Sequence, residues 1–342
     1  MNNILTDIRI MAFRYKLPSQ FKVLEISPTH QKKMLTGVLS PDKNSPFYPS
    51  RSDEKIMRTD VVSAIIGILE MLHELKITTS ERNKMALFVA NSIFIEENNK
   101  NLNRALGVLN KLGEYVTDKQ KLQAIYKNTP PLLALETLTN ATMSFISKYS
   151  KIKGQNTTFG STSHAAFEAL EEAIYQVRSK KKKVLVGGSN CSGLYSFLAY
   201  QNFYKDTTAW KESAGASFMI LGNEGKIKIS KIQHNYKLPS LGEQIITRNW
   251  KHFFKNNPPD FIVYSGGYTT EVFSENEKEI KQICSNYYTW EKEYGNLGSA
   301  AIFMNLAYGS ELIEKGITQT VDILNRDVYG REAHIRLEKA TD

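Results

Sequence analysis

The chain has 342 residues, 41% apolar and 23% charged, which is typical of a globular protein with one large or two medium domains. No apolar run approaches the roughly 18 residues of a membrane helix, so we expect no membrane-spanning segment. Two cysteines, Cys191 and Cys284, offer neither a disulfide framework nor zinc-ligand spacing. The net charge of +9 suits an acidic partner, and without a nucleic-acid recognition motif we expect that partner to be a protein.

The N-terminus and the cysteine usage indicate where the chain works. Its first residues, "MNNILTDIRIMAFRYK", carry charges inside the apolar run and do not resemble a signal peptide. Few cysteines without a pairing pattern are typical of a reducing compartment. We therefore expect a cytoplasmic protein with no bound metal.

The apolar periodicity predicts helices and strands that alternate along most of the chain. Residues 1–57 have weak periodicity, and at Asp60, a candidate N-cap, a helical stripe begins. The further predicted elements, in chain order, are a strand at 85–90, helices at 95–128 and 130–150, a strand at 156–159, a helix with its apolar face at 167, 170, 174 and 177, a strand at 183–190, a helix at 192–204, two strands within 216–233 joined by a hairpin turn at 223–225, a helix at 241–254, a strand at 260–267, helices at 274–287 and 297–313, and strands at 318–324 and 333–338. This alternation predicts a layered α/β fold with helices around mixed sheets. We place the boundary between an N-terminal and a C-terminal half near residue 205.

One segment has the local pattern of a nucleophile site. In "NTTFGSTSHAAFEAL" (156–170) a short strand turns through small polar residues into a helix, and Ser163 and His164 stand at the turn. Ser163 is either an acyl-accepting nucleophile or a helix cap. His164 is either its base or a buried structural histidine, although neighbours on a helix point about 100° apart.

Four segments, in order, resemble the thiolase-fold condensing enzymes, especially the β-ketoacyl synthases. "GQNTTFGSTSHAAFEALEEAIYQVRSKKKKVLVGGSN" (154–190) resembles their nucleophile segment, and "ESAGASFMILGNEGKIK" (212–228) resembles the strand that opens their second half. "DFIVYSGGYTT" (260–270) lies where their first histidine motif belongs, and "EKEYGNLGSAAIFMNLA" (291–307) resembles the segment of their third catalytic position. The resemblance implies a layered α-β-α-β-α fold of two similar halves, 1–205 and 206–342, with 1–57 matching poorly.

The catalytic positions of this family are degenerate here. The family's cysteine, whose thiolate a helix N-terminus favours, is replaced by Ser163. The first histidine position is Gly266, or Ser265 with a shift of one residue, and neither can stabilise the developing charge. The third position is Asn296, as in the asparagine branch of the family, and could still donate a hydrogen bond.

The resemblance therefore implies a chain-length factor, a ketosynthase-like subunit that is inactive alone. Such subunits form heterodimers with an active ketosynthase and shape the tunnel for the growing acyl chain, here in polyketide or fatty-acid-like elongation, with a polyene as one candidate product. The acyl chain would arrive on the phosphopantetheine arm of an acyl carrier protein, with no cofactor bound. The alternatives are an acyltransferase or thioesterase that uses Ser163 with His164 or a distant histidine, and a scaffold outside lipid metabolism.

Three apolar residues near the nucleophile segment, Met143, Phe159 and Phe167, are candidates for the tunnel wall or are plain core. Cys191 follows a glycine turn but lies outside the matched nucleophile segment, so we do not assign it catalysis. We expect Cys284 to be an ordinary buried or half-buried thiol.

Overall fold

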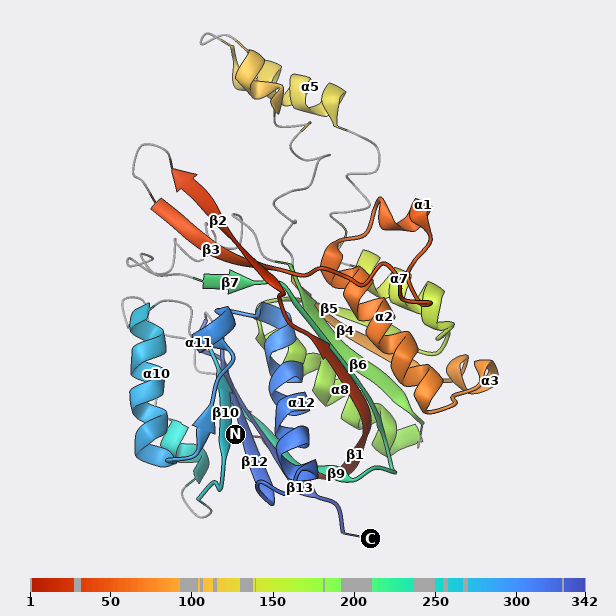
Figure 1. The fold of residues 1–342 in the computed structure, drawn as a ribbon, viewed down its shortest axis with the longest axis vertical. Helices are drawn as coiled ribbons and strands as arrows, with labels where there is room; N and C mark the ends of the chain where they lie inside the picture. Colours follow the sequence, from red (N-terminus) through yellow and green to blue (C-terminus); the bar gives the residue numbers. More distant parts are fainter. Residues whose placement is uncertain are drawn as a thin grey trace.

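A computed structural model of the chain describes residues 2–27, 32–92, 104, 107–112, 116–129, 138, 140–180, 182–191, 211–235, 250–254, 258–266, 270–327 and 329–341. Its main feature is a mixed sheet of ten strands within these residues (Figure 1). From edge to edge the sheet consists of β11 (Tyr287–Tyr288), β10 (Ile262–Ser265), β12 (Thr320–Arg326), β13 (Glu332–Lys339), β9 (Ile227–Asn235), β1 (Asn2–Lys16), β8 (Gly215–Gly222), β6 (Val184–Asn190), β4 (Ala86–Ser92) and β5 (Asn156–Ser161). A small second sheet has the order β2 (Gln20–Ser27), β3 (Lys32–Val38) and β7 (Lys211–Ser213).

The large sheet contains an internal repeat. In chain order β1, β4, β5, β6 and β8 are strands one to five of one set, and β9 to β13 are strands one to five of the other. Both sets have the spatial order 3-2-4-5-1, and the fifth strand of each runs antiparallel to both of its neighbours. This repeat confirms the prediction of two similar halves with mixed sheets. The predicted change of half near residue 205 lies outside the described residues, and the first set of strands ends with β8.

Strand β1 joins the two halves and was missed by the sequence prediction. It pairs antiparallel with both β8 and β9, so it lies at the centre of the sheet. The predicted hairpin between β8 and β9 is therefore wrong, because β1 lies between these strands instead of letting them pair. Local turn signals at 223–225 are compatible with either pairing, and only the remote N-terminal segment decides between them.

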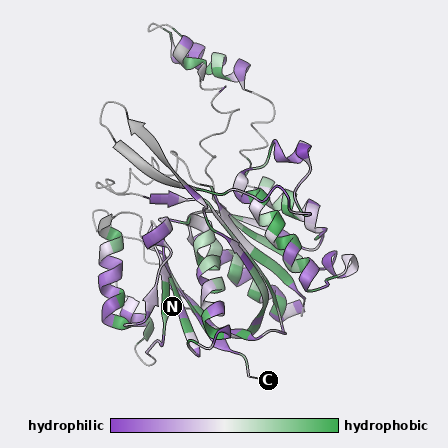
Figure 2. Ribbon diagram, viewed as in Figure 1, coloured by the Kyte–Doolittle hydropathy of each residue, from purple (hydrophilic) through white to green (hydrophobic). Residues whose placement is uncertain are grey.

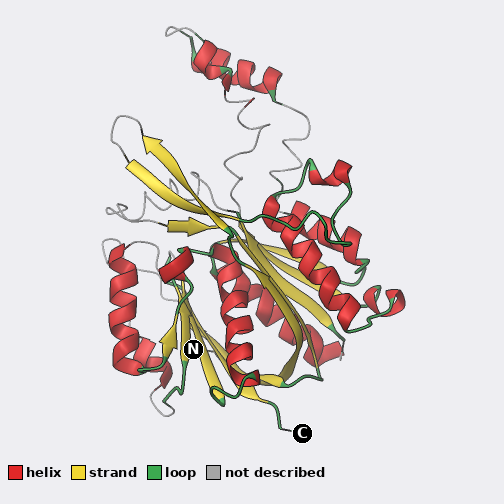
Figure 3. Cartoon of the chain, viewed as in Figure 1, coloured by secondary structure: helices red, strands yellow, loops and turns green. Residues whose placement is uncertain are grey.

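Helices complete a five-layer arrangement (Figure 3). The helical segments are α1 (Arg51–Glu54), α2 (Thr59–Glu74), α3 (Thr79–Arg82), η1 (Leu109–Lys111), α5 (Asp118–Asn128), α7 (Ala141–Ser150), α8 (His164–Lys180), η3 (Trp250–Phe254), α10 (Thr270–Ile283), α11 (Glu291–Tyr294), η4 (Gly298–Ala300) and α12 (Ala301–Glu314). Helices α8 and α12 share one apolar core with the inner faces of both halves of the sheet. Helices α2 and α7 cover the outer face of the first half, while η3 and α10 cover that of the second.

The strand residues alternate between these cores. On β4, Phe88 and Ala90 contribute to the central core, whereas Leu87 and Val89 contribute to the core under α2. Strands β4, β6 and β8 are consequently buried on both faces, as expected for a sheet covered on both sides, while α10 is largely hydrophilic (Figure 2). Among the described residues, no helix has both the length and the apolar character that crossing a membrane requires.

The predicted helix near residue 60 forms with a different start. Helix α2 begins at Thr59 with Arg58 as its N-cap residue, so Asp60 is not the cap. Asp60 is fully buried in the first turn and accepts hydrogen bonds from the Arg58 guanidinium at 3.0 and 2.8 Å. The carboxylate is held by a buried cation instead of by backbone N–H groups. The predicted helix at 192–204 lies outside the described residues.

Candidate functional site

The candidate site lies where β5 turns into α8. Ser163 is the last residue before the helix, and its carbonyl accepts a hydrogen bond from the Ala166 N–H at 3.2 Å, which closes the first turn. The apolar face predicted for this helix is buried against the sheet, and it holds the helix start close to β10 and β12 of the other half. Ser163 itself is only 2% exposed.

A buried chain of neutral groups holds the Ser163 hydroxyl. The Asn325 side-chain amide, at the end of β12, donates to Ser163 Oγ at 3.1 Å. Ser265 at the end of β10 donates to Asn325 Oδ1 at 2.8 Å, and the amide of Asn305 on α12 donates to Ser265 Oγ at 3.1 Å. All four residues are at most 2% exposed. We call Ser163, Asn325, Ser265 and Asn305 the neutral network.

This network does not activate the serine. A serine nucleophile needs a neighbouring base that removes its proton. The Asn325 amide nitrogen instead donates a proton to Ser163 Oγ, and an amide is not a base. The arrangement satisfies buried polar groups and fixes their positions.

His164 is adjacent to Ser163 but is a poor base. It is 4% exposed, and its ring stacks on Phe167 and His234 with centroid separations of 5.4 and 6.1 Å. Burial, with the nearby charges of Arg331 and His234, lowers the pKa of His164 to about 3. Within the described part of the chain, its Nδ1 atom has no hydrogen-bond partner. The ring is therefore neutral near pH 7 and belongs to the packed core.

A cluster of charged side chains forms hydrogen bonds and ion pairs at the same turn. Thr162 Oγ1 donates to Asp327 Oδ2 at 2.7 Å and accepts from Arg331 Nη2 at 2.7 Å. Arg331 Nε also donates to Asp327 at 2.6 Å, and its Nη1 reaches Glu168 on α8 at 3.4 Å. Asp327 is fully buried. The residues that follow β12 are thus tied to the start of α8, beside Ser163.

Gly266 follows β10 in a conformation that suits only glycine. Its φ is +128°, and a Cβ atom there would collide with the Arg326 carbonyl. Its N–H donates to Glu291 Oε1 at 2.8 Å, and its carbonyl accepts from Asn276 at 3.2 Å. No side chain can take the place of a catalytic histidine here, while the neighbouring Ser265 belongs to the neutral network.

Asn296 is held elsewhere in the fold. Its backbone forms two hydrogen bonds with β7. The Asn296 N–H donates to the Lys211 carbonyl at 3.0 Å, and the Asn296 carbonyl accepts from the Ser213 N–H at 2.9 Å. Its Oδ1 accepts from the Gly298 N–H at 2.9 Å, and its Nδ2 has no partner among the residues that the structure describes. The structure therefore links Ser163 and Ser265 by hydrogen bonds, but Asn296 does not join this network.

The remaining candidates are scattered. Phe167 is in the central core, Phe159 on β5 packs against it, and Met143 on α7 packs against the core under α2, on the other face of the sheet. Cys191 and Cys284 are both buried, and burial raises the pKa of the Cys284 thiol. In the described ranges no group of three His, Cys, Asp or Glu side chains could hold a metal ion.

Sequence reasoning missed the residues that hold Ser163. Asn305 is a single amide in the apolar run "AIFMNLAYG", which is a signal of a buried polar contact. Asn325 and Asp327 carry no comparable signal, because polar residues commonly follow a strand. Their partners lie more than 160 positions away in the sequence.

Comparison with known proteins gives a match in structure but not in sequence. No family model matches the chain, and no curated protein matches it. A chain of the solved complex AntDE:AntF, a type II PKS acyl-carrier protein with its ketosynthase, superposes with a TM-score of 0.68 and 14% identity over 98% of this chain and 100% of that chain. A chain of the complex between the ketosynthase ApeO and its chain length factor ApeC from Xenorhabdus doucetiae gives 0.70 and 10% identity over 98% of both. The chain therefore has the thiolase-like fold of the ketosynthases and chain-length factors.

Proposed function

We propose that this chain is a non-catalytic ketosynthase-like subunit. It pairs with an active β-ketoacyl synthase and forms part of the wall of the acyl tunnel. The reaction served is elongation of a polyketide or fatty-acid-like chain, with a polyene as one candidate product. The growing chain would be carried on the phosphopantetheine arm of an acyl carrier protein.

The neutral network is the observation that carries this proposal. A condensing enzyme has to present a nucleophile to a thioester and to stabilise the oxyanion that forms. Here the nucleophile position is 2% exposed and engaged by an amide donor. The arrangement fits a closed structural joint between two halves of the fold better than it fits a reaction centre.

Two neighbouring positions support the same conclusion. At Gly266 the backbone leaves no room for a side chain, so the position of the family's histidine has no donor of that kind. With its pKa lowered to about 3, His164 cannot act as an effective base near pH 7. The fold itself is retained, which is what a partner subunit needs.

The similar structures suggest the kind of partners. One contains a ketosynthase with its acyl-carrier protein, and the other a ketosynthase with its chain length factor. The net charge of +9 suits an acidic carrier protein. For this chain, both the ketosynthase partner and the carrier belong to the proposal.

An acylation experiment tests the absence of catalysis. The purified chain is incubated with acyl-carrier thioesters and its intact mass is followed, with an active ketosynthase as positive control. We expect the incubation to leave the mass of this chain, and that of the Ser163→Ala variant, the same as before the thioester was added. A stable adduct that disappears in Ser163→Ala would contradict the proposal and favour the acyltransferase or thioesterase alternative.

Co-expression tests the partnership. The chain is tagged and produced together with a cysteine-bearing ketosynthase encoded beside it. We expect the two to co-purify as a one-to-one complex and the complex to extend acyl chains that neither subunit extends alone. If the ketosynthase is fully active alone and never co-purifies, the partner role fails.

A further inference from the structure

Three helices of the first half end where three parallel strands begin. Helices α2, α7 and α8 lead into β4, β5 and β6 respectively, and Figure 1 shows α2 and α8 running toward the same end of the sheet. Because α8 has 17 residues, its last turn lies about 25 Å from Ser163, at the opposite end of the helix. We call the chain around these junctions the connecting segments, which are residues 75–84, 150–155 and 178–183.

The connecting segments contact one another and are strongly basic. The Gly154 N–H donates to the Met85 carbonyl at 3.0 Å, and the Lys183 ammonium is 3.4 Å from a carboxylate oxygen of Glu81. Glu81 is the one acid in the three segments. Their exposed cations, which we call the basic face, are Lys76, Lys84, Lys151, Lys153, Arg178, Lys180 and Lys182. Within the described part of the chain, none of these seven forms an ion pair with a carboxylate.

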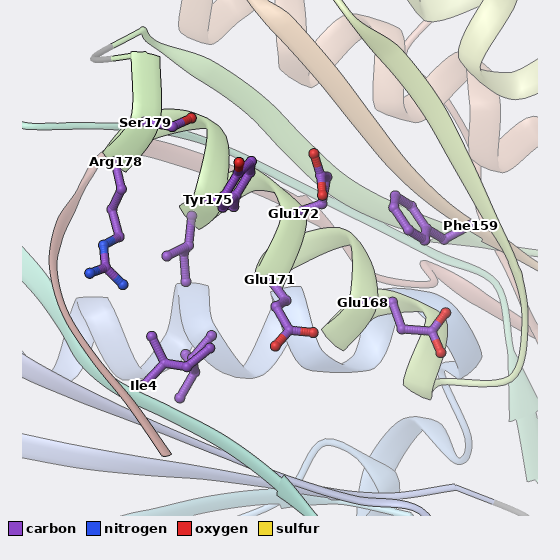
Figure 4. A pocket seen from close by; sticks show the side chains of 10 residues that line it. Ile4, Phe159, Glu168, Glu171, Glu172, Tyr175, Arg178 and Ser179 are labelled. Carbon is purple, nitrogen blue, oxygen red and sulfur yellow. The ribbon is translucent and has the colours of Figure 1, made fainter. Parts of the chain in front are cut away.

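The basic face has more positive charge than the helix ends need. Figure 4 shows one of these helices, α8, with Glu168 toward its start and Arg178 at its other end. Each helix C-terminus carries about half a negative charge, which favours nearby cations. Three helix ends therefore balance about one and a half cations, and the basic face has seven. The remaining positive charge faces solvent and attracts anions.

Two lysines of the basic face occupy backbone positions that favour glycine. Lys76 has a φ of +52° and Lys151 a φ of +62°, and no other non-glycine residue in the described ranges has a positive φ. They follow α2 and α7 at the position where glycine commonly ends a helix. After α12 this position is Gly316, with a φ of +71°. A cation at two strained positions of one face indicates a function for the charge.

The residue types at this end of the sheet indicate the class of anion. The connecting segments contain no aromatic residue, whereas sites for single-stranded nucleic acids stack bases on aromatic rings. Readers of duplex DNA insert the side of a helix or a β-ribbon into a groove, and here the helices present their ends. Lysine clusters of this kind attract anionic lipid headgroups. Because Ile77 and Ile152 are buried, such binding would be electrostatic.

We infer that the basic face binds the anionic surface of a lipid bilayer. Its lysines contact the phosphate groups of the lipids, and the first half of the sheet lies with its strands β4, β5 and β6 starting at the membrane. Ser163 is then on the side away from the bilayer. The inference uses residues that play no part in the proposed function. The acylation and co-expression experiments therefore have the same outcome whether or not the chain binds lipid.

Co-sedimentation of the full chain with vesicles tests the inference. We expect the chain to sediment with vesicles of phosphatidylcholine and phosphatidylglycerol but not with vesicles of phosphatidylcholine alone. Raising NaCl from about 0.1 M to about 1 M, which shortens the Debye length from roughly 10 to 3 Å, should release it. Equal binding to both kinds of vesicle, or binding that survives high salt, contradicts the inference. So does tighter binding to single-stranded or duplex DNA than to the anionic vesicles.

Two charge-matched variants locate the contact. Lys84→Gln/Lys153→Gln removes two cations of the basic face and should weaken binding to the anionic vesicles by about thirtyfold. Lys278→Gln/Lys292→Gln removes two exposed lysines of the second half and should weaken it by less than about threefold. Equal weakening in both variants would show that net charge alone acts, and would overturn the inference.

The two strained positions separate lipid binding from folding. Lys76→Gly/Lys151→Gly removes two cations of the basic face and also relieves the strain at two positive φ angles. This variant should bind the anionic vesicles about thirtyfold more weakly, while its midpoint of urea denaturation stays at or above that of the wild type. A variant that binds the vesicles as tightly as the wild type, or that is less stable, contradicts the role inferred for these two lysines.

Discussion

The two halves of the sheet present the same pair of strand ends but use them differently. In the first half Asn91 of β4 lies beside Ser189 of β6, and in the second Ser265 of β10 lies beside Asn325 of β12. In each pair the serine hydroxyl donates a hydrogen bond to the side-chain oxygen Oδ1 of the asparagine, at 3.4 Å in the first half and 2.8 Å in the second. Both halves thus carry one serine and one asparagine at these strand ends, with the two residue types exchanged between the second and the fourth strand of the set.

The difference lies in what each pair is connected to. Asn91 accepts a hydrogen bond from the Arg58 guanidinium at 2.6 Å, and Arg58 is paired with the buried Asp60. Asn325 instead donates to Ser163 of the other half, and every member of that network is neutral. A charged cluster therefore anchors α2 in the first half, whereas the second half uses neutral groups to hold Ser163 at the start of α8. The same strand ends therefore bind the base of α2 through Arg58 in one half and hold Ser163 at the start of α8 in the other.

The largest effect should come from breaking the charged cluster. Asp60→Ala leaves the Arg58 guanidinium buried without its carboxylate, which should lower the free energy of unfolding by about 3–5 kcal/mol. Urea denaturation measures this loss. Lys315→Ala removes an exposed ion pair with Glu311 and should change stability by less than about 0.5 kcal/mol. Similar losses in both variants would contradict a special role for the buried pair.

The two asparagines allow a direct comparison of the halves. Asn91→Leu removes an acceptor from a guanidinium and should cost about 3 kcal/mol, whereas Asn325→Leu interrupts only neutral bonds and should cost about 1–2 kcal/mol. Both residues are fully buried, so differences in exposure do not affect the comparison. Urea denaturation of both variants gives the ranking, and the reverse order would mean that the neutral network is the main anchor.

His164 should make the stability depend on pH. Its pKa is about 3 when folded against 6.5 for an ordinary histidine, so the unfolded chain binds the proton more readily. The contribution is complete above about pH 6.5 and is lost as the pH falls toward 3. Between pH 7 and 5 the wild type should lose about 2 kcal/mol more than His164→Leu, from about 1.5 pH units at roughly 1.4 kcal/mol each. Equal losses in the two proteins would show that the imidazole is not buried in its neutral form.

The smallest effect concerns the start of α12, which is the counterpart of the start of α8. Ser299 Oγ donates to the Ser189 carbonyl at 2.6 Å, so each helix start contacts the other half of the sheet. Ser299→Ala removes a single neutral hydrogen bond and should cost about 1 kcal/mol in thermal or urea denaturation. A loss as large as that of Asp60→Ala would place the main joint between the halves at α12 instead.

The sequence alone determined the parts of this protein that depend on local pattern and on residue identity. The apolar face of α8, the strands around it and the alternation of elements follow from periodicity, which acts within a few residues. The resemblance to the condensing enzymes also predicts, from residue identity alone, that Ser163 takes the place of a reactive cysteine and Gly266 that of a histidine.

Only the tertiary structure decided how these pieces meet. It placed β1 between β8 and β9, against the local hairpin signal, and there Thr6, Ile8 and Ile10 are buried at alternate positions of the strand. It also brought Asn325 to Ser163 across 162 positions of sequence and left Asn296 outside the network. Such contacts form only when two distant segments pack together. The local sequence of either segment does not predict which residue of the other will satisfy its buried polar groups.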